Sequence, residues 1–576
     1  MTHKKKLTIF MFFLIMGLYL GITNNYHFLY IEQLQLFLFS SEYLLDKFLE
    51  PGGFSAIAGE FLIQFFSIPF IGAFIIAALL TLALVEIRRL NQKYSGGFFF
   101  LDLLPILSLL LIQYNFNYKL QGTVAFLLGL FALNICIRIK STRNRLIAAA
   151  ISTPLLFWLG GAISFLFSIC LFLRESLLNP KIGLRFLLIV LEALLIGLGS
   201  VHLTLITEYR FAFLPDAYFH QKLFAPFAIY FAWISLPISI LGDYFCSKKE
   251  NNKHPKFVFS LQVILFLPIV YFSISKYDDR KSYTMKHLDY LTRTHNWDEI
   301  IHLSNGSIRN KLHLNYLNMA LMEKQELGDK LFNFDQHGPQ SLLVPWNKTF
   351  NVSTLLSDIY FTLGEIALSQ EMAFEANLSV MGNGNPRNLQ RLIQTNLITK
   401  NYKIAEKYIS LLEKTFAYRR WAQQHRQYLY NDELIEKDPV LGKKRKALPL
   451  KNTLIANSPL EKRLLTQAEQ YPCNPVPIQF TGSLFLLKKD LKSFKDLVEK
   501  YYGTPMLPSL PKNFQEAVLV LDRNYTKNIQ RYNINKDLVS RFEKIQQIIK
   551  QNDSQLPQRI KESFGDSYWA YILLNN

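Results

Sequence analysis

The stretch EYLLDKFLEPGGFSAIAGEFLIQFF, residues 42–66, decides the fold of this chain. Apolar runs with about the length of a membrane-spanning helix lie on both sides of it, at residues 7–23 and 68–85. Its Pro-Gly-Gly triplet at residues 51–53 predicts a turn between a short helix and an interfacial helix over residues 54–66. We therefore expect the stretch to form the first outer loop of a helical membrane protein.

Half of the 576 residues are hydrophobic, and in the first part of the chain they gather in long runs. Runs of this kind indicate membrane spans and not the amphipathic helices of a soluble protein. They predict a polytopic domain of about eight to nine membrane segments over residues 1–276. The further spans expected from these runs are residues 98–113, 123–139, 186–206, 223–245 and 257–275.

Residues 146–173 allow two interpretations because basic residues flank the run on both sides, among them Arg145 and Arg174. One span would place one basic flank outside, whereas a helical hairpin bent at STPLLFWLGG keeps both flanks inside. Each limb of such a hairpin is only about 14 residues long, which fits a re-entrant or shielded segment. We favour the hairpin.

Basic residues next to the spans set the predicted orientation. Lys4, Lys5 and Lys6 precede the first span, and no small-x-small cleavage site follows it. We therefore expect a retained signal anchor with a cytoplasmic N-terminus. The basic stretch CSKKENNKHPK, residues 246–256, is expected in the cytoplasm by the same rule. Residues 277–576 are then expected outside, which in a double-membrane bacterium is the periplasm, with the spans in its inner membrane.

Motifs of known chemistry are missing from the sequence. The net charge of +19 is spread over span flanks and helices, and no basic stripe with interleaved aromatic residues predicts nucleic-acid binding. The four cysteines have no CxxC or Cys/His spacing, so we predict no metal site. No G-x-x-x-x-G-K-[ST], H-E-x-x-H or G-x-S-x-G motif occurs, and any cofactor stays unknown.

Residues 277–576 have the composition of a soluble helical domain. The segments NWDEIIHL from Asn296, NYKIAEKYISLLEKT from Asn401 and KSFKDLVEKYYG from Lys492 place apolar residues three and four positions apart. Paired helices of this kind recur in tetratricopeptide (TPR)-like solenoids. The basic run at residues 443–446 is expected in a surface loop. The predicted fold class is all-α, a polytopic helical membrane bundle followed by a soluble TPR-like α-solenoid.

Carboxylates near the outer membrane surface are the main candidates for chemistry. Glu42, Asp46 and Glu50 are four residues apart and would share one face of a helix, while Glu60 lies in the apolar interfacial helix. We expect Glu42, Asp46 and Glu60 to be catalytic, as a general base or as part of a phosphate site. The alternatives are a solvated helix for Glu42 and Asp46, and a buried carboxylate tied to a neighbouring helix for Glu60.

The later outer loop TEYRFAFLPDAYFHQK, residues 207–222, contains the expected substrate-binding residues Arg210, Asp216 and His220. Either Arg210 or His220 would bind a phosphate. Asp102 and Glu192 lie within expected spans, where ionisable residues permit a transport function.

The expected architecture resembles that of C-type glycosyltransferases, which use polyprenyl-phosphate sugars. These enzymes have many spans, an acidic first outer loop, an interfacial helix and often an outer soluble domain. The resemblance implies an enzyme that modifies an envelope glycan or lipid with such a sugar. Two alternatives stay open: a membrane-anchored scaffold whose solenoid binds envelope proteins and, less favoured, a transporter.

Three further segments point to one family: EQLQLFLFSSEYLLDKFLEPGGFSAIAGEFLIQFF, TPLLFWLGGAISFLF and LFNFDQHGPQSLLVPW. They resemble a family of multi-span membrane proteins of Bacteroidota that has no assigned activity. The resemblance covers most of the chain. It implies the membrane architecture and an envelope location, and it carries no catalytic residues over to this sequence.

Overall fold

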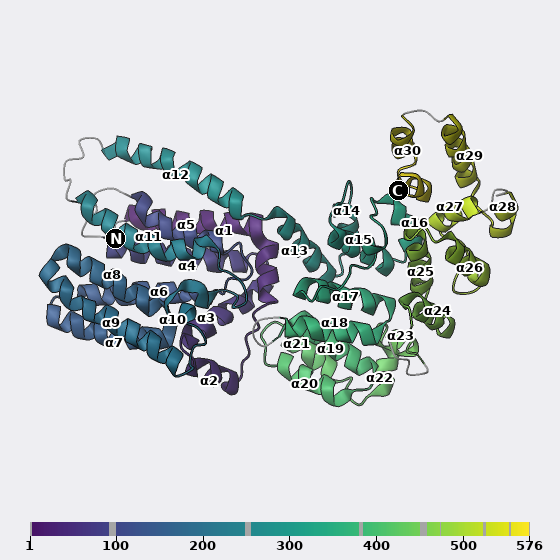
Figure 1. Cartoon of the computed structure of the whole chain (residues 1–576). Helices are drawn as coiled ribbons and strands as arrows, with labels where there is room; N and C mark the ends of the chain where they lie inside the picture. The colour runs from purple at the N-terminus through teal and green to yellow at the C-terminus, as the bar shows by residue number, and fades with distance from the viewer. Residues whose placement is uncertain are drawn as a thin grey trace. The chain divides into compact units, whose positions relative to one another are not determined.

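The computed structural model describes residues 3–91, 99–247, 255–379, 384–449, 458–472, 474–521, 526–551 and 555–574. All regular elements in these ranges are helices, so the predicted all-α class is confirmed (Figure 1). The chain divides into two compact units. The first spans Met1–Lys286 together with Lys414–Arg419, and the second comprises His287–Val380, Gly384–Glu413 and Arg420–Asn576.

The long helices of the first unit lie side by side (Figure 1). Helix α4 packs against α1 and α6, helix α9 against α7 and α8, and helix α5 against α11 and α12. The helices of this part are α1 His3–Glu32, α2 Ser41–Leu49, α3 Gly53–Ile63, η1 Gln64–Ser67, α4 Ile71–Leu90, α5 Phe99–Ile112, α6 Gln121–Arg138, α7 Thr142–Gly160, α8 Ile163–Leu178, α9 Pro180–His202, α10 Tyr209–Phe213, η3 Pro215–Tyr218, α11 Phe227–Ser247 and α12 Pro255–Tyr277. Helix α13, Arg280–Arg293, begins in the first unit and ends in the second.

Five helices in the described ranges are long and apolar enough to cross a membrane. They are Lys6–Glu32, Ile71–Leu90, Gln121–Arg138, Pro180–His202 and Phe227–Phe245. The other expected spans fall on α5, α7, α8 and α12, which do not meet the same length and composition within the described residues. The total of about eight to nine membrane segments therefore stays a prediction.

Helix α1 continues beyond the predicted end of the first span at residue 23. It reaches Glu32, with non-helical backbone at Asn24 (φ −133°, ψ 17°). Phe28 and Ile31, which follow this break, are buried in the core of the first unit. Packing of these apolar side chains keeps the chain helical beyond the predicted end of the span.

Residues 146–173 belong to two helices, α7 and α8, which pack against each other. The bend falls at Gly161, where a φ of 79° favours glycine, while Pro154 lies inside α7. Arg145 near the start of α7 and Glu175 near the end of α8 form a 3.0 Å ion pair. Both basic flanks therefore lie at the same end of the first unit, in agreement with the hairpin interpretation.

The first unit combines a buried apolar core with an apolar outer surface. Core side chains such as Ile63, Leu80 and Phe167 are at most 1% exposed. On the outside, Leu184, Leu188 and Leu195 of α9 and Ile264, Leu265 and Phe272 of α12 are 59% to 70% exposed. Apolar side chains on the outer surface of helices this apolar are typical of contact with lipid.

In the second unit, consecutive helices pack on one another, from α17 to α20 and from α24 to α27. Asn and Asp side chains cap several of these helices, for example Asn385, which accepts a hydrogen bond from the N–H of Asn388. The helices are α14 Trp297–Leu303, α15 Lys311–Glu323, α16 Leu327–Lys330, η4 Leu331–Asn333, η5 Pro339–Ser341, α17 Phe350–Leu363, α18 Ile366–Leu378, α19 Pro386–Ile398, α20 Tyr402–Leu412, α21 Arg419–Arg426, α22 Asp432–Lys437, α23 Leu441–Lys446, α24 Leu460–Gln470, α25 Val476–Leu487, α26 Leu491–Tyr501, α27 Lys512–Leu521, α28 Thr526–Tyr532, α29 Lys536–Gln551, α30 Leu556–Phe564 and α31 Tyr568–Leu574.

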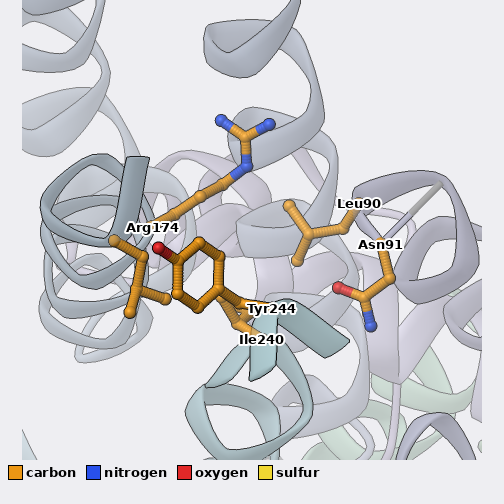
Figure 2. A pocket seen from close by; sticks show the side chains of 6 residues that line it. Leu90, Asn91, Arg174, Ile240 and Tyr244 are labelled. Carbon is orange, nitrogen blue, oxygen red and sulfur yellow. The ribbon is translucent and has the colours of Figure 1, made fainter. Parts of the chain in front are cut away.

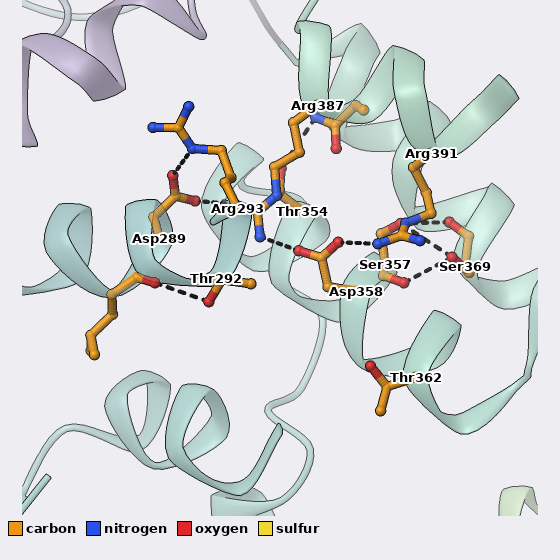
Figure 3. A network of polar contacts seen from close by, with 12 residues as sticks. Asp289, Thr292, Arg293, Thr354, Ser357, Asp358, Thr362, Ser369, Arg387 and Arg391 are labelled. Atoms are coloured by element: carbon orange, nitrogen blue, oxygen red, sulfur yellow. Dashed lines mark hydrogen bonds and ion pairs between the residues drawn. The ribbon is translucent and has the colours of Figure 1, made fainter. Parts of the chain in front are cut away.

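A buried ion network joins α13, α17 and α19 in the second unit (Figure 3). Arg387 pairs with both Asp289 and Asp358, Arg391 pairs with Asp358 at 2.9 Å, and Arg293 pairs with Asp289 at 3.3 Å. These five side chains are 8% to 17% exposed. Each carboxylate is shared between two guanidinium groups, so the network connects three helices that are distant in sequence.

The basic run at residues 443–446 lies in helix α23 and not in the expected surface loop. Arg445 is 9% exposed, and its guanidinium group donates hydrogen bonds to the carbonyl oxygens of Leu397 and Ile398 at the end of α19. It also pairs with Asp432. The prediction was wrong because the last carbonyl groups of a helix attract cationic side chains, a contact that local charge does not indicate.

Candidate functional site

A glycine turn joins α2 to α3 and contacts two other parts of the first unit. The N–H of Gly52 donates to the carbonyl oxygen of Trp158 at 2.8 Å, and the Gln121 amide donates to the carbonyl oxygen of Gly52 at 3.2 Å. Gly52 has a φ of 80°, and a Cβ at Gly53 would lie 1.9 Å from the carbonyl oxygen of Lys47. Gly52 therefore lets the turn close against α6 and α7, and Gly53 lets α3 begin in contact with the end of α2.

Glu60 of α3 is tied to α2. Its carboxylate accepts hydrogen bonds from the Tyr43 hydroxyl and the Lys47 ammonium group, and its side chain is 15% exposed. Burial, and then the charge of Glu60, raise the pKa of the Tyr43 phenol. Glu60 thus matches the alternative of a buried carboxylate tied to a neighbouring helix.

Lys119 lies in the loop between α5 and α6, which an isolated antiparallel bridge fixes to the loop between α9 and α11. The N–H of Lys119 donates to the carbonyl oxygen of Tyr218 at 2.9 Å. The Tyr218 hydroxyl donates to the carbonyl oxygen of Gly160 at 2.6 Å and accepts from the N–H of Ile163 at 3.1 Å. Two loops and the α7–α8 bend therefore hold the backbone of Lys119.

Lys119 interacts electrostatically with four other ionisable side chains. We call these five residues the loop-end cluster: Lys47, Glu50, Glu60, Lys119 and His220. Burial lowers the pKa of Lys119 and the charge of Lys47 lowers it further, whereas Glu60 and Glu50 raise it. Burial also lowers the pKa of His220, followed by the charges of Lys119 and Lys222. Within the described residues no hydrogen bond or ion pair engages the Lys119 ammonium group, which is therefore available to an anionic ligand.

Glu42 and Asp46 lie outside the loop-end cluster. Both are exposed on α2, and neither makes a hydrogen bond or an ion pair within the ranges that the structure describes. Glu50 follows the end of α2 with extended backbone (φ −84°, ψ 146°), so the prediction that it shares a helical face with them was wrong. The glycine turn ends the helix before Glu50 and leaves this carboxylate exposed near Lys119.

Arg210 and Asp216 have partners of their own. Arg210 donates to Glu208 at 2.7 Å and to a backbone carbonyl oxygen of the same loop at 3.0 Å. Asp216 is 6% exposed and accepts a 2.7 Å hydrogen bond from the Tyr230 hydroxyl. Of the three predicted substrate-binding residues, His220 alone belongs to the loop-end cluster.

Glu32, the last residue of α1, is a buried carboxylate of the first unit. It is 3% exposed and accepts hydrogen bonds from the Gln33 amide at 2.6 Å and the Tyr418 hydroxyl at 2.7 Å. Tyr418 belongs to Lys414–Arg419, the later segment that clusters with the first unit. Local sequence patterns hold no information about such a pair, because its members are far apart in the chain.

A second polar region of the first unit lies between α4, α5 and α11. The Asn91 amide donates to Asp102 at 2.6 Å and to the Ser239 hydroxyl at 2.9 Å, and Ser239 donates to Asp102 at 3.0 Å. Asp102, one of the two residues that permit a transporter, is thus held inside the helix bundle by two donors. Glu192 on α9, the other one, has no hydrogen bond or ion pair within the described residues.

A pocket lies beside this polar region (Figure 2). Arg174 is 4% exposed and pairs with Glu175 at 3.2 Å, and Glu175 also pairs with Arg145 at 3.0 Å. These contacts satisfy Glu175 and join α7 to α8. The pocket is lined by Leu90, Asn91, Arg174, Leu177, Ile240 and Tyr244.

Sequence reasoning missed Lys119. It stands alone as a basic residue in YNFNYKLQG, a short loop expected on the outer side. A lysine in an outer loop runs against the positive-inside rule, and this is the signal that could have found it. No group of three or more His, Cys, Asp or Glu residues in the described ranges is arranged to hold a metal ion.

A family model covers almost the whole chain. It is described as a family of unknown function (DUF6057) and matches residues 2–575. The chain belongs to the DUF6057 family. The predicted membership of a family without an assigned activity is thus confirmed. A comparison with curated proteins found no match, and neither did a comparison with solved structures. The loop-end cluster of this DUF6057 chain is therefore interpreted from its own chemistry.

Proposed function

We propose that this DUF6057 chain is a multi-pass protein of the bacterial inner membrane that transfers a sugar from a polyprenyl phosphate to an envelope glycan or lipid, as C-type glycosyltransferases do. The loop-end cluster is the observation that carries the proposal, because Glu50 and Glu60 of the α2–α3 segment interact electrostatically with Lys119, and Lys119 interacts with His220 of a third loop. A phosphate-linked donor needs cationic groups, and a hydroxyl acceptor needs a general base beside them.

The cluster contains the groups that this transfer requires. Lys119 would pair with the donor phosphate, His220 would donate a hydrogen bond to it, and the exposed Glu50 would accept the proton of the acceptor hydroxyl. The acceptor oxygen forms a bond to the anomeric carbon while the bond from that carbon to the phosphate oxygen breaks, and the polyprenyl phosphate leaves with the electron pair. Glu60, tied to Tyr43 and Lys47, would position α2 and α3.

Charge and apolar surface support the membrane placement. Arg88 and Arg89 end α4, and Arg138 ends α6, at the end of the helices opposite the glycine turn that contacts the start of α6. The positive-inside rule assigns these arginines to the cytoplasm and the loop-end cluster to the periplasmic surface. The N-terminus is then cytoplasmic, and residues 277–576 are periplasmic.

The second unit supports a second candidate function. Neighbouring helices packed in chain order, as in α17 to α20, are the arrangement expected of a TPR-like solenoid over residues 277–576. Such a solenoid would bind envelope proteins, with the spans serving as an anchor. A transporter is less favoured, because Asn91 and Ser239 already satisfy the intramembrane Asp102.

The test compares lipid-linked sugars and surface glycans in a deletion strain that is complemented with variants at equal protein abundance. Lys119→Met and Glu50→Gln each remove one charge of the loop-end cluster and are expected to leave the glycan defect in place. The matched controls are Glu42→Gln on α2 and Lys403→Met on α20, which change exposed side chains outside the cluster. Both controls should restore the glycan.

Two outcomes would contradict the proposal. If deletion changes no lipid-linked sugar and no glycan, the transferase function is wrong. If Lys119→Met and Glu50→Gln restore the glycan as fully as the controls do, the loop-end cluster is not the site. If the glycan defect persists only in variants with changes on the surface of the second unit, the scaffold function is favoured.

A further inference from the structure

Glu192 lies near the middle of a helix that is apolar enough to cross a membrane, Pro180–His202. At the rise of a helix, it is about 9 Å from residue 186, where the expected span begins, and about 15 Å from the last residue of α9. No side chain or backbone group in the described part of the chain bonds to it. Lipid tails offer neither a hydrogen bond nor a counter-charge, so a carboxyl group at this depth needs a partner from elsewhere.

The residues that lie in line with Glu192 along α9 are not covered by other parts of the described chain. Leu188 and Leu195 are 61% and 69% exposed, and a Cβ at Gly199 would meet no atom within 4 Å. Leu188, Glu192, Leu195 and Gly199 follow one another at spacings of four, three and four residues. This spacing is typical of the contact line between two parallel helices, and a small residue lets the backbones approach. We call these four residues the α9 seam.

We propose that the α9 seam is the contact between two copies of this chain in the membrane. Copies inserted in the same orientation bring their α9 helices together in parallel, so the two Glu192 side chains meet at the same depth. Two neutral carboxyl groups satisfy each other, because each donates from its hydroxyl and accepts at its carbonyl oxygen. Lipid or an apolar helix would cover the leucines and leave Glu192 unsatisfied, which favours a second copy as the occupant.

The inference goes beyond the proposed enzyme and rests only on the membrane insertion of α9. The test uses the full chain in its native membranes, expressed as two copies with different affinity tags. A photo-activated cross-linking residue replaces Leu195 in the α9 seam, and in the control it replaces Ile151, which is 63% exposed on α7. Cross-links between the two tagged copies are expected from position 195 and not from position 151.

Variants of Glu192 then test the role of the carboxyl group. Glu192→Leu is expected to lower the yield of cross-linked dimer at least tenfold, whereas Glu192→Gln keeps it, because a carboxamide also donates and accepts. Carbonate extraction checks that each variant stays in the membrane. A variant that fails to insert is thus distinguished from one that inserts but does not form the dimer. The proposal is overturned if position 195 forms no cross-link between copies, if it captures only a different protein, or if Glu192→Leu cross-links as well as the wild type.

Discussion

The backbone N–H of Lys119 donates a 2.9 Å hydrogen bond to the carbonyl oxygen of Tyr218, and this bond joins two loops that lie far apart in the sequence. The Tyr218 hydroxyl continues the connection to Gly160 and Ile163 at the bend between α7 and α8. The placement of the Lys119 backbone thus depends on a tyrosine that is 1% exposed.

Tyr218→Phe is expected to lower the free energy of unfolding by about 1–3 kcal/mol, because it removes a buried hydroxyl that both donates and accepts. Thermal unfolding in lipid nanodiscs measures this change. Tyr209→Phe is the control, since Tyr209 is 52% exposed and its hydroxyl makes no hydrogen bond within the described residues. Equal stability of the two variants would contradict the role assigned to Tyr218.

Gly53→Ala is expected to destabilise the first unit by about 1–3 kcal/mol, because the new Cβ would overlap the carbonyl oxygen of Lys47 and force α2 away from α3. The measurement is again thermal unfolding in nanodiscs. Ser40→Ala, just before α2, should change stability by less than about 0.5 kcal/mol because the Ser40 side chain forms no capping hydrogen bond. If Gly53→Ala were as stable as Ser40→Ala, the close approach at this turn would be disproved.

Arg387→Met is expected to destabilise the second unit by about 3–5 kcal/mol, because Asp289 and Asp358 each lose one of their two guanidinium partners while staying buried. Hydrogen exchange in α17 and α19 of the full chain reports this loss locally. Lys437→Met breaks an ion pair whose side chains are 70% and 79% exposed, so exchange should hardly change in that variant. Unchanged protection of α17 in Arg387→Met would show that the network does not hold these helices together.

Glu516 is expected to make the stability of the second unit depend on pH. Its side chain is fully buried, its carboxylate accepts a 2.8 Å hydrogen bond from the N–H of Tyr568, and its other oxygen lies 3.9 Å from the Lys512 ammonium group. Burial outweighs these favourable contacts and raises the pKa of Glu516 to about 7 from its ordinary value of 4.5. The folded chain therefore holds this proton more tightly than the unfolded chain does.

The free energy of unfolding should fall as the pH rises from about 4.5 to about 7, by up to about 3 kcal/mol, and this contribution should then stay constant. Glu516→Gln is expected to remove the slope, which denaturant titrations between pH 5 and pH 8 would measure. Asp566 provides an internal contrast, because Arg541 and Lys512 hold its pKa down to about 2 and it titrates below this window. A slope that persists in Glu516→Gln would assign the pH dependence to another group.

Patterns that act over a few residues were predicted well. The glycine turn, the apolar helices on both sides of it and the division of residues 146–173 into two helices follow from backbone preference and hydrophobicity, which operate locally. The predictions failed where a distant part of the chain competes with local preference. Helix α1 continues to Glu32 because Phe28 and Ile31 are buried, and Arg445 turns inward because it donates to carbonyl oxygens at the end of α19.

The sequence by itself determined that this chain is helical, that much of its first part suits a membrane, and which residue types are available in the loops between the apolar helices. Only the tertiary structure decided which of those residues meet: Glu60 pairs with Lys47 and Tyr43, Asp216 with Tyr230, and Glu50 and His220 lie around Lys119. The physical reason is that periodicity and hydropathy are properties of neighbouring residues. An electrostatic cluster depends instead on the distances between loops that the sequence separates.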